Sequence, residues 1–70
     1  MENKYAIHIF WSDEDGGFIG ICEDFPGLSA FGETREEALK ETQIALSLMI
    51  EHYEASNQPL PEPSSVMVAA

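Results

Sequence analysis

Apolar and polar residues alternate over positions 4–11, "KYAIHIFW", which places Tyr5, Ile7, Ile9 and Trp11 on one side. Alternation among β-branched and aromatic residues is typical of a strand. Segments 18–23 and 28–32 have similar character, and each follows a turn that contains glycine. Asp15-Gly16 predicts a tight hairpin and "DFPG" predicts a corner, because glycine accepts a positive φ and proline presets its own φ. The pattern therefore predicts a three-stranded antiparallel meander.

The hydrophobic period changes after Thr34, and residues 35–56 are predicted to form one long helix. The Thr34 hydroxyl can cap the backbone N–H of Glu37, and the Glu37 side chain can reach back. Asn57 is the expected C-terminal cap, and Pro59 prevents continuation. Apolar residues occupy roughly two-thirds of the helix circumference, wider than the ~100° stripe needed to pack on one sheet. We therefore expect a second protomer to cover part of the helix. The helix residues expected at this interface are Leu39, Ile44, Leu48 and Ile50.

The chain after the helix is predicted to be a proline-spaced connector over 57–63, followed by a fourth strand over 65–69. That strand could join the sheet of its own chain or pair with a neighbouring protomer. The fold class is therefore α+β, with the order βββα and then β, in two layers. Seventy residues allow a single domain, 1–70.

The formal net charge of −10, with only three cations, narrows the choice of partners. Nucleic acid and anionic membranes require clustered Lys and Arg, so we expect neither to bind directly. A basic protein is the natural complement, and acidity that serves solubility alone is the alternative. So short a chain buries only about 60% of its unfolded surface, and a lone Cys22 cannot form an internal disulfide. We therefore expect self-association. With no secretory signal and no bilayer-length apolar run, we expect a cytoplasmic location.

Tests for catalytic and metal-binding chemistry are negative. A calcium loop starting at Asp13 would need a ligand at Gly17 and a glycine at Phe18, and both requirements fail. Cys22 has no basic neighbour in the sequence and is expected to be a buried structural residue. His8 is expected to be packed, hydrogen-bonded or at an interface, and His52 to be solvated or at an interface. We expect no catalytic residue, no metal ligand and no cofactor.

The order of these features resembles the HicB-type antitoxin domain. The matching parts are an aromatic-led strand at Tyr5, an acidic hairpin at 13–17, the corner at 24–27, the helix start "GETREEA" at 32–38, and the spaced prolines at 59–63. The match extends over nearly the whole chain, and its specificity comes from the order and spacing of parts that are individually weak.

The resemblance implies a partial ribonuclease-H-like fold that lacks the metal-binding carboxylates of that enzyme. It also implies a partner, a small basic HicA-type toxin that cleaves messenger RNA, and association into dimers or tetramers. Many such antitoxins continue into an operator-binding module, whereas this sequence stops at Ala70. We therefore expect that this polypeptide does not bind an operator directly.

Turn location and charge select the candidate partner-binding residues. Two aromatic residues, Trp11 and Phe25, are the expected apolar anchors. The expected steering charges are Asp13, Glu14, Asp15, Glu23 and Asp24. The alternative function is a stand-alone homo-oligomeric structural or small-ligand-binding module without a toxin partner, since the wide apolar arc of the helix supports either.

Overall fold

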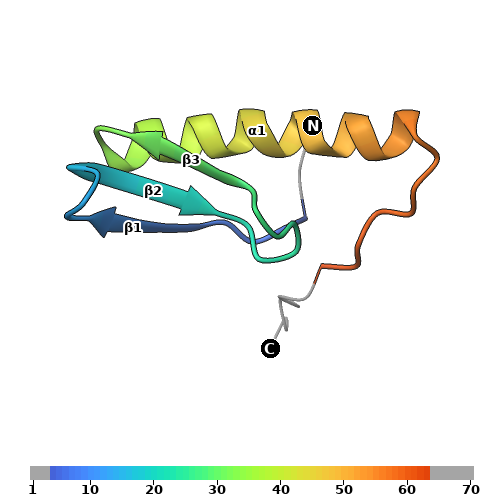
Figure 1. Cartoon of the computed structure of the whole chain (residues 1–70), viewed down its shortest axis with the longest axis horizontal. Coiled ribbons are helices and arrows are strands. Elements are labelled where there is room, and N and C mark those ends of the chain that lie inside the picture. The colour runs from blue at the N-terminus through green and yellow to red at the C-terminus, as the bar shows by residue number, and fades with distance from the viewer. Residues whose placement is uncertain (1–3, 64–70) are drawn as a thin grey trace.

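The computed structural model describes residues 4–63 and has two layers, a three-stranded antiparallel sheet and one long helix packed on it (Figure 1). The elements are β1 (His8–Ser12), β2 (Gly17–Ile21), β3 (Ser29–Gly32) and α1 (Arg35–Ala55), and the sheet order is β1-β2-β3. The predicted α+β arrangement of a meander followed by a helix is confirmed. The first strand begins at residue 8 rather than 4. The expected fourth strand lies outside the described residues.

The strand register divides the side chains between two faces of the sheet. Trp11 pairs with Phe18, which pairs with Gly32, and one residue away Phe10 pairs with Ile19, which pairs with Phe31. Gly20 and Gly32 face the helix, because a Cβ at either would meet Thr42 or Ala38. Since successive residues alternate in direction, the row Phe10–Ile19–Phe31 lies on the opposite face, which no described element covers.

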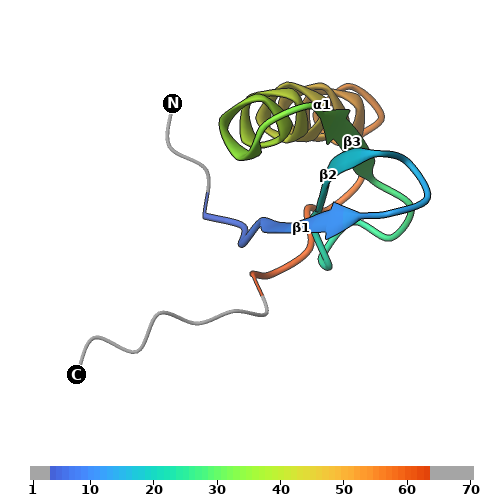
Figure 2. The same ribbon diagram turned by 90° about the vertical axis from the view of Figure 1, so that its left-hand side faces the viewer.

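The first half of α1 lies unusually close to the sheet. Gly20 and Gly32 leave space that Thr42 and Ala38 occupy, and both helix residues are fully buried. The Thr42 hydroxyl donates a 2.6 Å hydrogen bond to the Ala38 carbonyl, so its polar atom is satisfied in the core. The helix lies over β3 and β2 and leaves β1 as the less covered edge strand (Figure 2).

The second half of α1 covers the hydrophobic core at the opposite end of the sheet. Its buried residues are Cys22, Phe25, Leu28 and Leu46. The Phe25 ring packs edge-on between Tyr5 and Tyr53, with centroids 4.9 and 5.4 Å away. The Tyr5 hydroxyl donates a 2.6 Å hydrogen bond to the Pro61 carbonyl. That bond joins the first described residues to the connector, which contains neither helix nor strand over 57–63.

The predicted turns and the N-terminal helix cap are confirmed, whereas the C-terminal cap is Ser56 rather than the expected Asn57. Gly16 and Gly27 have positive φ values of 67° and 90°. Thr34 accepts a 3.0 Å bond from the Glu37 N–H, and the Glu37 carboxylate accepts 2.7 Å from the Glu33 N–H. At the other end, Asn57 takes the left-handed conformation (φ 56°) one residue after Ser56, the structural C-cap. Within residues 4–63, no helix has the length and apolar character needed to cross a membrane.

Candidate partner-binding surface

The β1–β2 turn and the start of α1 lie at the same end of the molecule, which we call the acidic end (Figure 1). The reason is topological: in an antiparallel meander, β3 returns to the end where β1 turns into β2, and α1 begins just beyond it. Six exposed carboxylates are brought to this end by the turn and by the start of the helix: Asp13, Glu14, Asp15, Glu33, Glu36 and Glu37.

Trp11 is exposed at the edge of this acidic end, with 52% of its surface accessible. Its ring packs edge-on against Phe18 at 5.2 Å between centroids, and the Arg35 guanidinium lies 5.0 Å from the Phe18 centroid. The indole Nε1 donates a 2.6 Å hydrogen bond to Asp13 Oδ1. These contacts hold the indole in one orientation beside the carboxylates, so little side-chain entropy is left to lose on binding.

Hydrogen bonds within the β1–β2 turn hold Asp15 and the turn backbone. The Ser12 hydroxyl donates to Asp15 Oδ2 at 2.8 Å, and the Asp15 N–H donates to the same hydroxyl oxygen at 3.3 Å. The Gly16 N–H donates to the Ser12 carbonyl at 2.9 Å. These bonds give the turn a defined backbone conformation.

The structure separates the predicted partner-binding residues into two groups. Trp11 and the acids at 13–15 lie together at the acidic end, whereas Glu23, Asp24 and Phe25 follow the other end of β2. Phe25 is only 1% exposed. The expectation that it anchors a partner does not fit this burial, because Tyr5 and Tyr53 enclose its ring. Sequence proximity suggested one site, but an entire strand separates the two groups.

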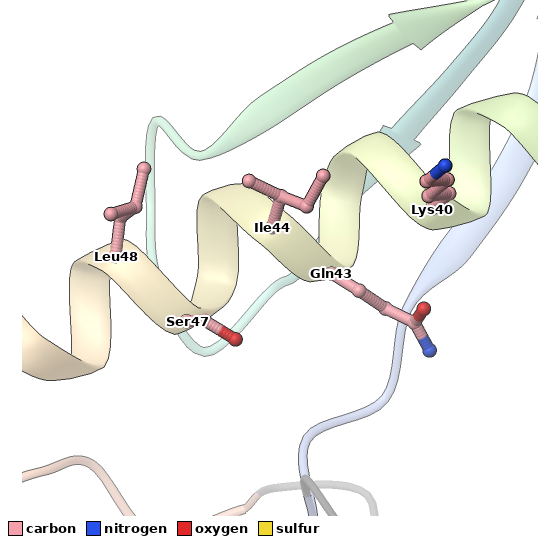
Figure 3. Close-up of a pocket in the computed structure, with 5 residues that line it drawn as sticks. All are labelled: Lys40, Gln43, Ile44, Ser47 and Leu48. Carbon is pink, nitrogen blue, oxygen red and sulfur yellow. The ribbon is translucent and has the colours of Figure 1, made fainter. Parts of the chain in front are cut away.

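The predicted oligomer-interface residues also differ from one another. Leu39, Ile44 and Leu48 are exposed by 39%, 47% and 61%, whereas Ile50 is half-buried and packs against the core. Ile44 and Leu48 project from the same side of α1, away from Gln43 and Ser47 (Figure 3). A shallow depression of 280 Å³ lies on this part of the helix and is lined by Lys40, Gln43, Ile44, Ser47 and Leu48.

Sequence reasoning missed the apolar row on the open face of the sheet. Phe10 and Phe31 are 45% and 43% exposed, and Ile19 lies between them in the register. The available signal was the alternation over 4–11, in which Phe10 occupies the side opposite Trp11. On β3, it is Gly32, the residue after Phe31, that faces the helix.

The titratable residues singled out from the sequence lie either in the core or on the surface. Cys22 is 2% exposed, and burial raises the pKa of its thiol, so it is held as the neutral form expected of a core residue. His8 is exposed rather than packed, with Nε2 3.5 Å from Glu23 Oε2, and His52 is exposed on α1. Among residues 4–63, no group of three His, Cys, Asp or Glu side chains is arranged to hold a metal ion.

Residues 4–63 thus form a meander with one capped helix, an acidic end and exposed apolar residues on the sheet and on α1. The chain matches, over residues 4–69, the family described as the HicB-like antitoxin of bacterial toxin–antitoxin systems. It belongs to that family, as the resemblance of its motifs predicted. A curated relative, "UPF0150 protein ssr1765" from Synechocystis, is 38% identical over 48 residues, which are 69% of this chain and 61% of that protein. The match thus spans less than two-thirds of the relative's length.

Proposed function

We propose that this protein is a non-enzymatic antitoxin that binds and neutralises a small, basic, HicA-type toxin that cleaves messenger RNA. Membership of the HicB-like antitoxin family supports the antitoxin role. The choice of surface rests on the acidic end, where six exposed carboxylates lie at the same end of the molecule as an exposed tryptophan that is hydrogen-bonded to one of them, Asp13. We place the interaction in the cytoplasm, where messenger RNA is available to such a toxin.

Electrostatic complementarity provides the first step of this binding. A messenger-RNA-cleaving protein needs a basic surface to hold phosphates, and the same surface is attracted by clustered carboxylates. The acids of the 13–15 turn have no role in the core, since all three are exposed. These acids accelerate the encounter with the toxin and orient it. The toxin residues that bind RNA phosphates are then paired with carboxylates of the antitoxin.

Trp11 supplies the apolar part of the interface. Aromatic side chains surrounded by polar contacts often account for much of the binding free energy of an interface. The indole is half exposed, rests on Phe18 and is held by Asp13, so it is already in a binding orientation. Burial of the toxin's active site beneath this surface inhibits RNA cleavage without any chemistry by the antitoxin.

The test is the affinity for the basic protein encoded beside this chain, measured by titration calorimetry at low and moderate salt. Asp13→Lys/Glu14→Lys is expected to weaken binding about 100-fold at low salt, because attraction at two sites becomes repulsion. The matched control is Glu54→Lys/Glu62→Lys, which changes the net charge equally on exposed residues remote from the acidic end. The control should lower affinity less than about 5-fold.

Inhibition of RNA cleavage is the second readout. The Trp11→Ala protein should fold, but the antitoxin concentration needed to block cleavage should rise at least about 10-fold. Equal effects of the two lysine double variants would show that only net charge matters and would remove the acidic end from the interface. Absence of binding to the neighbouring basic protein would contradict the antitoxin proposal itself.

Self-association is the second part of the proposal. A chain of this size has a small core, and in α1 it exposes Leu39, Ile44 and Leu48. The alternative of a small-ligand-binding module is less well supported. The depression on α1 is lined by residues of a single helix, so it could not surround a ligand as a binding cleft does. A dimer or tetramer in solution is therefore expected with or without toxin.

A further inference from the structure

We propose that Arg35 positions Trp11 by acting through the Phe18 ring, so that a cation strengthens the binding of a basic partner to the acidic end. Arg35 is the only lysine or arginine in segments 11–18 and 32–38, which supply that end. Charge alone would make such a residue unfavourable for a basic partner. The contacts that carry the proposal belong to the free protein, and only their effect on the partner rests on the function proposed above.

Three consecutive contacts connect the first residue of α1 to the β1–β2 turn. The Arg35 guanidinium lies 5.0 Å from the Phe18 centroid. The Phe18 and Trp11 rings are packed edge-on, with 5.2 Å between centroids and an interplanar angle of 75°. The indole Nε1 then donates its 2.6 Å hydrogen bond to Asp13 Oδ1. The guanidinium is thus placed on an aromatic ring whose other ring neighbour is the exposed tryptophan.

The close approach of the helix to the sheet explains why Arg35 reaches Phe18. Ala38 occupies the space that Gly32 leaves, and Gly32 pairs with Phe18 in the sheet. Arg35 precedes Ala38 by three residues, so both side chains lie on the helix face that is turned toward the sheet. The packing of Ala38 on Gly32 therefore brings the guanidinium, one turn earlier, to the ring on the neighbouring strand.

Neither helix formation nor core packing accounts for a cation at this position. The first turn of a helix carries a partial positive charge and favours acids, and Glu36 and Glu37 follow that preference. Arg35, at the first helical residue, opposes it. The Arg35 side chain is also exposed, so it contributes little to the core. Its contact with Phe18 therefore acts on the surface, where Trp11 rests on the same ring.

Exchange of the indole N–H with solvent tests the effect in the free protein. Trp11 is the only tryptophan, so nuclear magnetic resonance gives one indole signal, whose exchange rate reports on the bond to Asp13. Arg35→Ala should accelerate exchange about 2- to 5-fold, the factor that corresponds to an exposed cation–π contact. Arg35→Lys keeps a cation and should cause a smaller change. Urea unfolding of each variant separates this local loosening from a loss of global stability.

Lys40→Ala is the matched control for charge. It removes the same charge from another exposed residue of α1, one that lines the depression on the helix instead of contacting a ring. Exchange of the Trp11 indole N–H should stay at the wild-type rate in this variant. An unchanged rate in Arg35→Ala, or an equal acceleration in Lys40→Ala, would overturn the proposal.

A double-mutant cycle tests whether the effect passes through Phe18. Phe18→Leu keeps an apolar side chain but removes the aromatic face, so Arg35→Ala should cause no further acceleration in that background. Phe18→Tyr keeps the aromatic face, and in that background Arg35→Ala should retain its effect. A full effect of Arg35→Ala beside Phe18→Leu, or its loss beside Phe18→Tyr, would show that Arg35 does not act on Trp11 through the ring.

Affinity for the basic protein encoded beside this chain tests the consequence for binding, because positioning and charge predict opposite signs. Arg35→Ala and Lys40→Ala each make the chain one unit more negative. Lys40→Ala should bind at least as tightly as the wild type, whereas Arg35→Ala should bind about 2- to 5-fold more weakly. Tighter binding of Arg35→Ala would overturn the proposed effect on the partner. A wild-type protein that does not bind would contradict the proposed function, while the exchange measurements would still decide the role of Arg35.

Discussion

The two ends of β2 are built from similar residues but have opposite roles. Each is a turn that combines acids, an aromatic residue and a glycine with positive φ: Asp13 to Gly16 beside Trp11, and Asp24 to Gly27 around Phe25. At the first end the aromatic ring is 52% exposed, and at the second it is 1% exposed. The difference is produced by what lies above each turn.

The second half of α1 and the connector cover the corner that contains Phe25. Tyr53 comes from the helix, and the Tyr5 ring is held by its hydrogen bond to Pro61. At the acidic end the helix is only beginning, and Arg35 covers Phe18 but not Trp11. One end of β2 therefore contributes its aromatic ring to the core, whereas the other end leaves its ring exposed.

The largest expected effect is the difference in stability between truncating the aromatic ring at one end and truncating it at the other. Phe25→Ala should lower the free energy of unfolding by about 3–5 kcal/mol, because the cavity would be enclosed on all sides. Trp11→Ala should lower it by only about 1 kcal/mol, since it removes one edge-on ring contact. Urea unfolding followed by circular dichroism measures both. If Phe25→Ala does not fold, Phe25→Leu should still cost more than Trp11→Ala, and the reverse order would contradict the comparison.

A smaller effect is expected from adding a methyl group where the helix approaches the sheet. A Cβ on Gly32 would meet backbone atoms of Ala38, which cannot rotate away, so Gly32→Ala should cost about 1–3 kcal/mol. Gly16→Ala at the tip of the acidic turn has open space and a φ of 67°, so it should cost about 1 kcal/mol from backbone strain. Thermal unfolding of both variants provides the measurement. Equal losses would show that the helix is seated less closely than described.

The smallest effect concerns the pH dependence of the buried end. Burial raises the pKa of the Cys22 thiol above its unfolded value, so the folded state keeps a proton that the unfolded state releases. The resulting stability is fully present below the unfolded pKa of about 8.5 and is lost as pH rises through the folded pKa. The free energy of unfolding should therefore decline from about pH 8.5 upward.

Cys22→Ala is the control for this pH dependence. It should be less stable near neutral pH because it leaves a small cavity, but its stability should vary less just above pH 8.5. The Tyr5 pKa is also raised, first by burial and then by Asp24, so its effect appears at higher pH in both proteins. Parallel curves for the two proteins over the lower range would contradict the assignment to Cys22.

The candidate site shows where prediction from the sequence stopped. Trp11 and the acids at 13–15 lie close together because only a few residues of chain link them. Glu23 and Asp24 were grouped with them, although the five residues of β2 separate the groups by about 17 Å at 3.4 Å per residue. Glu33, Glu36 and Glu37 were assigned only to the helix start, yet the return of β3 brings them to the same end.

The sequence alone determined the turns, the helix limits and the order of elements. Gly16, Gly27, Thr34 and Asn57 act on backbone atoms within a few positions of themselves, so their consequences follow from local chemistry. Tertiary structure alone decided which aromatic ring is buried, which face of the sheet stays open and which acids meet. Burial depends on residues distant in the chain. Neither the packing of Tyr53 from α1 on Phe25 nor the exposure of Phe10 and Phe31 among the described residues is encoded in the local alternation.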